Sequence, residues 1–146
     1  MDKEEIKSVW SECVGSITKN DLTELKSFAA PPQLAITVST ALNIILMNKK
    51  IEEKNSWKEF QKQANNPSAL LKVLLQYNAQ EMKAKNLEMV KAFLKEKNLD
   101  KQEDNKKVAK ISRAMKQIHQ WILNLIEEVE KHAELDKEIA KNEKFE

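Results

Sequence analysis

Basic residues gather within one short stretch of the sequence. Their type and spacing make them the best candidates in this chain for a functional role, which would be the binding of an anionic partner. They are Lys106, Lys107, Lys110 and Arg113, which we call the basic patch. Residues 101–120 hold six cations and two acids, whereas residues 121–146 hold four cations and eight acids. On one continuous helix, Lys106, Lys110 and Arg113 would fall within about 60° of one another around the axis. Such a face is either an ordinary solvated surface or a docking site for an acidic partner.

Other reactive residue types are too few or too far apart to build a catalytic, metal or cofactor site. His119 and His132 have no Cys or His partner at the spacing of metal ligands, so we expect His119 on a helix surface and His132 on an apolar seam. Cys13, the single cysteine, lies on an apolar stripe and is interpreted as a small core residue. Gly15 is the single glycine, so a phosphate-cradling loop is excluded. We therefore expect no enzyme activity, no metal and no cofactor.

The composition predicts helices throughout. One glycine and three prolines leave little from which to build β-turns, and period-two runs of β-branched residues are missing. A lone cysteine fits a reducing compartment. The longest apolar run, Leu34 to Met47, is shorter than the roughly 20 residues that span a bilayer, so we expect no membrane segment. Nucleic acid is a weak candidate partner, because no aromatic residue interleaves with the cations of the basic patch.

Capping and proline signals predict where the helices begin and end. The first helix is expected to open at Asp2, and its heptad stripe comprises Ile6, Trp10, Cys13 and Ile17. Pro31-Pro32 should end one helix and start the next, which runs from about 32 to 48 and is apolar nearly all round. That apolar helix is the predicted centre of the core. Further caps are predicted at Ser56, Asn66, Asn78 and Asp104.

The last predicted helix carries the longest heptad stripe of the chain. Its members are Val108, Ile111, Met115, Ile118, Ile122, Leu125 and Val129. A stripe of roughly 30 residues would extend about 45 Å, so its distal part needs a partner outside a small bundle. The N-terminal stripe could pair with it. The sequence thus predicts an all-α protein, a compact multi-helix head (21–120) on a short antiparallel two-stranded coiled coil made of a first arm (1–20) and a second arm (121–146).

The order of these features resembles the microtubule-binding domain at the tip of the stalk of dynein heavy chains. The resemblance covers roughly residues 18 to 135. It is carried by these residues, in order: Asp21-Leu22, Leu25-Lys26-Ser27-Phe28, Pro31-Pro32, Ser56-Trp57, Leu70-Leu71, Tyr77-Asn78-Ala79-Gln80-Glu81-Met82, Val108, Ser112, Ala114 and Trp121. Cytoplasmic members carry a lysine near position 36 or 37, where this sequence has Ile36 and Thr37. That departure leans towards a ciliary dynein.

The resemblance implies binding to αβ-tubulin in microtubules, with the remainder of a dynein heavy chain as the second partner and the ATPase ring outside this chain. It implies contact through the helix after Pro31-Pro32 and the helix leading into the second arm, and Lys110 lies where the family often has a basic residue facing tubulin. Affinity would follow the register of the two arms. The expected location is the cytoplasm and cytoskeleton, or the ciliary axoneme. The alternative is a helical scaffold or adaptor domain that recognises a partner helix through apolar grooves.

Overall fold

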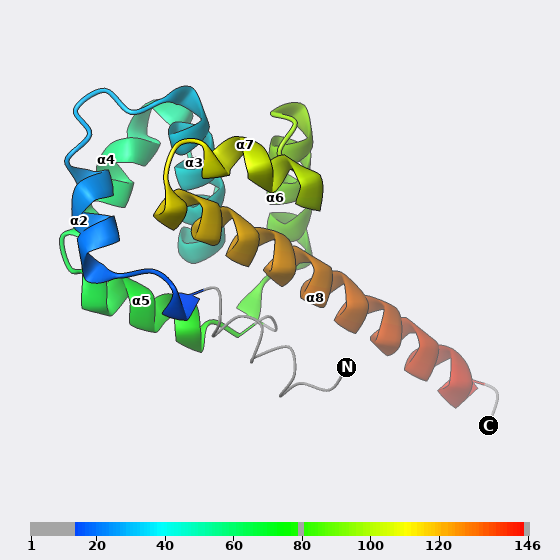
Figure 1. Ribbon diagram of the computed structural model, residues 1–146. Coiled ribbons are helices and arrows are strands. Elements are labelled where there is room, and N and C mark those ends of the chain that lie inside the picture. The colour runs from blue at the N-terminus through cyan, green and yellow to red at the C-terminus, as the bar shows by residue number, and fades with distance from the viewer. Residues whose placement is uncertain (1–13, 79–80, 145–146) are drawn as a thin grey trace.

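The computed structural model describes residues 14–78 and 81–144, with side chains up to Ala133. Every regular element in these ranges is a helix (Figure 1). In chain order they are α2 (Lys19–Lys26), α3 (Gln33–Met47), α4 (Glu53–Ala64), α5 (Pro67–Gln76), α6 (Ala84–Glu96), the 3₁₀ helix η2 (Gln102–Asp104), α7 (Asn105–Ala109) and α8 (Arg113–Lys144). The predicted all-α bundle is confirmed.

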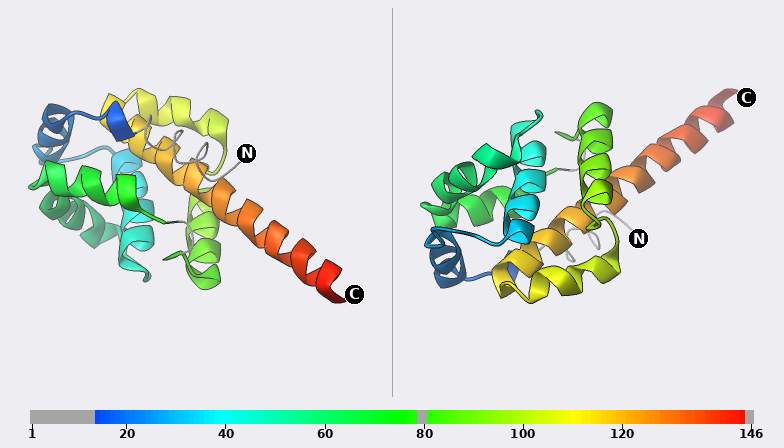
Figure 2. Two further views of the ribbon diagram at one scale, coloured as in Figure 1. Left: turned by 90° about the horizontal axis from the view of Figure 1, so that it is seen from below. Right: turned by 90° about the horizontal axis from the view of Figure 1, so that it is seen from above.

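The predicted coiled-coil stub is only partly visible. The long helix α8 leaves the bundle and runs on beyond it in each view (Figures 1 and 2). The first arm, with its cap at Asp2 and most of its stripe, lies largely in residues 1–13, outside the described residues. The pairing of the two arms and the division at residues 20 and 120 therefore stay predictions. No helix in the described part of the chain is both long and apolar enough to cross a membrane.

Helix α3 forms the centre of the core, as the apolar run predicted. It begins after Pro32, whose ψ of 153° is extended, and it packs against α4, α6 and α8. Ten of its residues are buried, and the polar ones find partners there. The Thr40 and Ser56 hydroxyls lie 2.8 Å apart, and Asn43 donates from Nδ2 to the carbonyl oxygen of Ser56 at 3.1 Å. These bonds let polar side chains enter the core without an unpaired donor.

The predicted helix starts meet different outcomes. Asn66 caps α5 as expected, because its Oδ1 accepts from the Ala69 amide at 3.3 Å, and proline follows it. The cap predicted at Ser56 is wrong: α4 begins three residues earlier, and Ser56 is buried against α3. The cap predicted at Asn78 is also wrong, because α6 begins at Ala84. A polar side chain can cap a helix only where its own backbone and the backbone before it are not helical. Tertiary packing decides where that happens.

The first described helix explains the break in heptad phase after Ile17. Thr18 is the N-cap of α2, and its Oγ1 accepts from the Asp21 amide at 3.0 Å. Asp21 Oδ2 accepts in return from the Thr18 amide at 3.0 Å. This capping box starts a new helix rather than continuing the old one. The shift in apolar phase is therefore a real helix boundary.

The prediction of one continuous helix from Asp104 onward is wrong, because α7 and α8 are separate. The chain turns at Lys110, and the amide of Ile111 donates to the carbonyl of Val108 at 2.9 Å. Ser112 Oγ accepts from the Met115 amide at 2.9 Å, as an N-cap does. Helix α7 consequently lies alongside the first turns of α8 (Figure 1). Apolar residues on both sides of this turn enter the same core, which is why the heptad spacing concealed it.

Candidate functional site

The basic patch lies around the turn between α7 and α8. Lys106 and Lys107 belong to α7, Lys110 follows its last residue, and Arg113 is the first residue of α8. All four residues are exposed. They do not share one face of a continuous helix, because the turn interrupts it. The structure instead places them on two adjoining helix ends at one corner of the bundle.

Lys107 is the most engaged of the four cations. Its Nζ lies 3.1 Å from Asp104 Oδ1 and 3.3 Å from the carbonyl oxygen of Asn98. Burial raises the pKa of Asp104, but the Lys101 amide and Lys107 outweigh burial, so the net pKa of this carboxyl is below its usual value. Lys107 therefore helps to hold the start of α7. It is less available to a partner than its position in the sequence suggested.

Arg113 is tied to the N-terminal part of the chain. Its guanidinium donates from Nη2 to the carbonyl oxygen of Ser16 at 3.1 Å. Asp21 lies close enough for the charge of Arg113 to contribute to the lowered pKa of that carboxyl, after the dominant hydrogen bond from Thr18. A hollow of about 180 Å³ separates α2 from the α7–α8 turn here, and Asp21, Glu24 and Arg113 are among its lining residues. The segment before α2 and the basic patch thus meet at Arg113.

Lys106 and Lys110 are the least constrained members of the basic patch. Both are exposed, and no ion pair within the described part of the chain engages either of them. An exposed cation that forms no ion pair is available to an incoming anionic surface. These two lysines are therefore the strongest candidates for direct contact.

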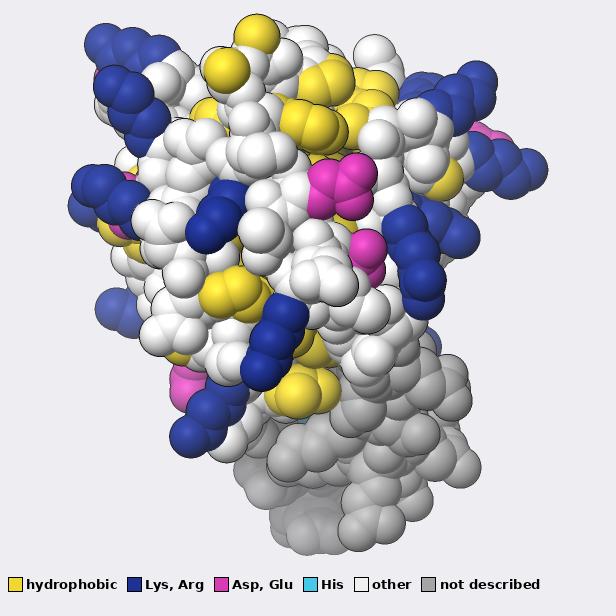
Figure 3. Space-filling view, turned by 60° about the vertical axis from the view of Figure 1, so that its left-hand side comes forward, with side chains coloured by type: hydrophobic (Ala, Val, Ile, Leu, Met, Phe, Trp, Pro, Cys, Tyr) yellow, Lys and Arg dark blue, Asp and Glu magenta, His cyan; other side chains and the backbone are white. Residues whose placement is uncertain are grey.

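Basic side chains also stand out around the face that carries α2 and α4. Figure 3 shows lysine and arginine side chains around the rim of that face and within it, with a few acidic side chains near its centre. Hydrophobic side chains gather at one edge of the same view. The distribution suits an acidic partner larger than a peptide, because the cations are spread over the surface rather than focused in a cleft.

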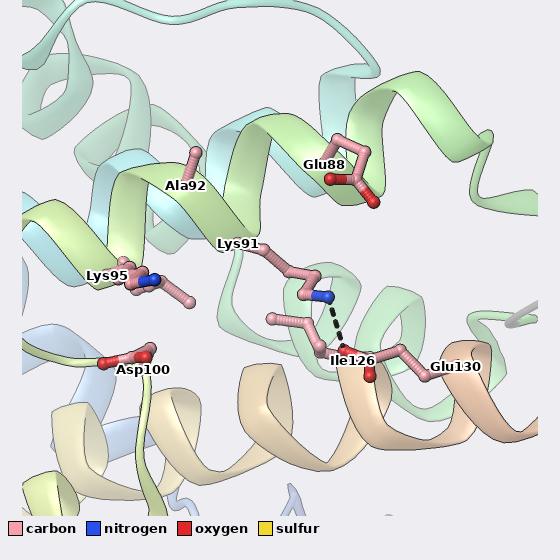
Figure 4. Close-up of a pocket in the computed structure, with 8 residues that line it drawn as sticks. Glu88, Lys91, Ala92, Lys95, Asp100, Ile126 and Glu130 are labelled. Carbon is pink, nitrogen blue, oxygen red and sulfur yellow. Dashed lines mark ion pairs between the residues drawn. The ribbon is translucent and has the colours of Figure 1, made fainter.

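A second feature is a cleft of about 480 Å³ between α6 and α8 (Figure 4). Lys91 of α6 reaches across it to Glu130 of α8, with Nζ and Oε1 3.2 Å apart. Lys95 and Asp100 lie towards the other end of the cleft. Both signs of charge are present, so the cleft has no preference for an acidic partner. Among the described residues, no group of three or more His, Cys, Asp or Glu side chains could hold a metal ion.

A family model described as the microtubule-binding stalk of the dynein motor matches residues 4–144. The chain belongs to this family. The dynein beta chain, ciliary, of Tripneustes gratilla is 29% identical over 116 residues, which cover 79% of this chain and 2% of that protein. The protein of the same name from Heliocidaris crassispina is 28% identical over 116 residues, again 79% of this chain and 2% of that protein.

One buried residue of this dynein stalk domain escaped sequence reasoning. His119 was expected on a helix surface, but it is completely buried, so that expectation is wrong. Its Nε2 lies 2.8 Å from the carbonyl oxygen of Leu99, and its Nδ1 lies 2.9 Å from Asn105 Nδ2. Burial lowers the pKa of His119, and this effect outweighs the Leu99 hydrogen bond and Asp104, which both favour the charged ring. The available sequence signal for its burial was its position directly after Ile118, a member of the heptad stripe.

His132 lies further along α8 in the stalk domain. It is partly exposed, and its Nε2 lies 3.4 Å from Glu128 Oε1, one helical turn earlier. This contact is an ordinary pair between residues four apart on a helix. The described structure gives His132 no second histidine and no role beyond this pair. Cys13, the remaining residue singled out by its chemistry, lies outside the described residues.

Proposed function

We propose that this dynein stalk domain binds αβ-tubulin in microtubules through the corner where α7 meets α8. The observation that carries the proposal is the exposure of Lys106 and Lys110 at this corner without a partner acid in the described chain. Family membership supports the class of partner, since the family model is named for microtubule binding. The remainder of a dynein heavy chain is the second partner, because this chain corresponds to 2% of the relatives' length.

Charge complementarity accounts for how this surface could bind. Tubulin presents an acidic surface, so cations that stand free at one corner both steer the encounter and favour one orientation. Lys107, which is paired with Asp104, would add less than Lys106 and Lys110. Contacts of this kind are weakened by salt within a screening length of about 8 Å at physiological ionic strength. The proposed role is binding alone, with no catalytic step in this chain.

We also propose that the arms control affinity through Arg113. The guanidinium contacts Ser16, at the end of the first arm, while its backbone starts the helix that becomes the second arm. Helix α2 packs against both α4 and α8. A change of register between the arms would therefore alter the surroundings of Arg113 and the angle of the α7–α8 corner. The names of the curated relatives favour a place in the ciliary axoneme, within the cytoskeleton.

One observation favours a second candidate function. Val73 and Leu75 on α5 are 47% and 44% exposed, and Leu71, one turn before Leu75, is partly buried. Exposed apolar side chains on one helix suit an adaptor that recognises a partner helix. The basic patch plays no part in that alternative. Binding to a partner protein that persists in Lys110→Glu but is lost in Leu75→Glu would favour the adaptor.

Microtubule co-sedimentation of the whole chain tests the proposal. Lys110→Glu should weaken binding at least tenfold, whereas Lys141→Glu should change it little, because residue 141 lies near the far end of α8. The two variants carry the same net charge, so a difference between them isolates position from charge. Added salt should narrow the difference. An equal loss of microtubule affinity in both variants would refute the basic patch as the contact. Unchanged affinity in Lys110→Glu would refute charge complementarity as the mechanism of binding.

A further inference from the structure

The buried pair Asn105 and His119 joins the short helix that carries the basic patch to the long helix that leaves the bundle. Asn105 is the first residue of α7, and His119 lies within α8. Asn105 Nδ2 lies 2.9 Å from the carbonyl oxygen of Lys116 and 2.9 Å from His119 Nδ1. Both side chains are buried. The bonds therefore cross between the two helices inside the protein, where solvent cannot replace them.

Two backbone carbonyls determine which atoms carry hydrogen in this pair. The Lys116 carbonyl can only accept, so the Asn105 atom facing it must be the amide nitrogen. That nitrogen then also donates to His119 Nδ1, which must be unprotonated. The Leu99 carbonyl can likewise only accept, so His119 Nε2 must carry the ring hydrogen. The contacts are satisfied together by one state alone, the neutral ring with hydrogen on Nε2.

We propose that Asn105 and His119 are positioning residues, whose hydrogen bond holds α7 and its lysines against α8 only while the histidine is neutral. A proton on Nδ1 would point at the amide hydrogens of Asn105, so two donors would face each other in a buried site. Turning the Asn105 amide to present Oδ1 to the ring would place that oxygen against the Lys116 carbonyl, so we expect relief to come from movement of α7 away from α8. Lys106 and Lys107 would move with it, and so would Lys110 at its end. The effect on microtubules rests on the proposed function, whereas the effect on α7 does not.

Few charged groups face this pair. From η2, Asp104 acts on the ring and favours its charged form, but Asp104 is itself paired with Lys107. From the preceding connection, Leu99 presents its carbonyl, and the neighbouring Asp100 is exposed. Helix α3, which also packs against α8, contains no charged residue. On α8 itself Lys116 is exposed. The pair thus lies in a site where burial dominates, in agreement with the lowered pKa of His119.

The sign of the pH dependence follows from linkage. The ring takes up a proton near pH 6.5 once α7 has opened, but only at lower pH while α7 is closed. The closed state is therefore fully favoured above about pH 6.5. As the pH falls below that value towards the closed-state pKa, opening becomes easier by up to about tenfold per pH unit. Movement of α7 away from α8 must bend the turn that joins them, so hydrogen exchange at the Ile111 amide, which donates to the Val108 carbonyl in that turn, is expected to report the opening.

The experiment uses the whole chain, with the wild type compared with His119→Gln. Ring nitrogen NMR should show the neutral Nε2–H form at pH 7. Exchange of the Ile111 amide, corrected for the intrinsic rate, should lose up to about tenfold protection per pH unit below about 6.5 in the wild type. Glutamine offers an NH₂ donor group and a carbonyl acceptor and does not titrate, so the variant should lose this pH dependence. Co-sedimentation at pH 7.2 and pH 6.2, compared between the two proteins on the same microtubules, should show weaker binding for the wild type alone at the lower pH.

The outcomes separate the two proposals. A ring with hydrogen on Nδ1 at neutral pH, or Ile111 protection independent of pH, overturns the inference without any variant being needed. Protection that falls with pH while microtubule binding does not change overturns the link between the position of α7 and binding. A third outcome is that neither the wild type nor His119→Gln binds microtubules at either pH, while Ile111 protection still falls with pH in the wild type alone. That result supports the role of the Asn105–His119 hydrogen bond and refutes the proposed function.

Discussion

Arg113 donates a hydrogen bond to the carbonyl oxygen of Ser16 at 3.1 Å, across a sequence separation of 97 residues. The bond connects the last turn before α2 with the first residue of α8. It is exposed, so its contribution to the free energy of unfolding should be small. Its importance is geometric, because it joins the segment before α2 directly to a member of the basic patch.

Arg113→Ala should loosen this connection without unfolding the domain. We expect hydrogen exchange at the Ile17 amide, which donates to the Val14 carbonyl, to become several-fold faster. The free energy of unfolding should change by less than about 1 kcal/mol, because the lost bond is solvent-exposed. Lys116→Ala removes an exposed cation one turn along α8 and serves as the control. Unchanged exchange at Ile17 in Arg113→Ala would show that Arg113 does not hold the arm.

Trp121→Phe should be among the more damaging conservative substitutions. Trp121 is fully buried on α8 and donates from Nε1 to the Leu74 carbonyl at 3.2 Å, which ties α8 to α5. Phenylalanine would remove that hydrogen bond and leave the space of the second ring empty, at a cost of about 2–4 kcal/mol in urea denaturation. Trp57→Phe is the matched control, since Trp57 donates to the Phe28 carbonyl at 3.1 Å but remains 8% exposed. A larger loss in the control would contradict this ranking.

Tyr77→Phe should stabilise the domain or leave it unchanged. The Tyr77 hydroxyl is buried and has no hydrogen-bond partner among the described residues, while its ring meets Trp121 edge-on with centroids 5.6 Å apart. Removing an unpaired buried hydroxyl should gain up to about 1 kcal/mol and keep the ring contact. Thermal denaturation at neutral pH measures this difference. A loss greater than 1 kcal/mol would indicate a partner for the hydroxyl.

The same tyrosine predicts a limit to stability in alkali. Burial, with a smaller effect from Glu81, raises the pKa of Tyr77 from 10.0 to about 12. The folded state therefore favours the protonated phenol, so its contribution to stability is complete below pH 10 and is lost as the pH rises from 10.0 to about 12. The loss should be about 1.4 kcal/mol per pH unit within that window. Tyr77→Phe should lack this component, and identical alkaline unfolding of both proteins would rule Tyr77 out as its source.

The Lys91–Glu130 pair should contribute little to folding. Its side chains are 40% and 45% exposed, so solvent screens the attraction across the cleft between α6 and α8. A double-mutant cycle with Lys91→Ala and Glu130→Ala should give a coupling free energy below about 1 kcal/mol, smaller still at high salt. Lys97 and Glu53, 2.9 Å apart and about one-third exposed, form the comparison pair. A stronger coupling for Lys91–Glu130 would mean that this bridge holds α6 to α8.

Local signals predicted much of the bundle because their physical cause is local. Pro31-Pro32 cannot lie within a helix, so α3 had to begin after them, and its all-round apolar surface had to be buried. Asn66 followed by Pro67 specifies a cap and first turn with no help from the rest of the chain. The basic patch was likewise apparent from composition, because charge density does not depend on how the helices pack.

Tertiary packing decided the features that concern function most. The turn at Lys110 was concealed because Val108 and Met115 both reach the core from opposite sides of it. How available each cation is to a partner depends on the groups that folding brings near it. Lys107 donates a hydrogen bond to the carbonyl oxygen of Asn98, and Arg113 donates one to the carbonyl oxygen of Ser16.

The sequence by itself determined that the chain forms helices, that α3 begins after Pro31-Pro32, and that the basic residues gather in one stretch. Only the tertiary structure shows that His119 is buried, because the Leu99 carbonyl and the Asn105 amide that contact it come from separate segments. Hydrogen-bond partners across segments leave no periodic trace in a sequence, whereas apolar faces and helix caps do.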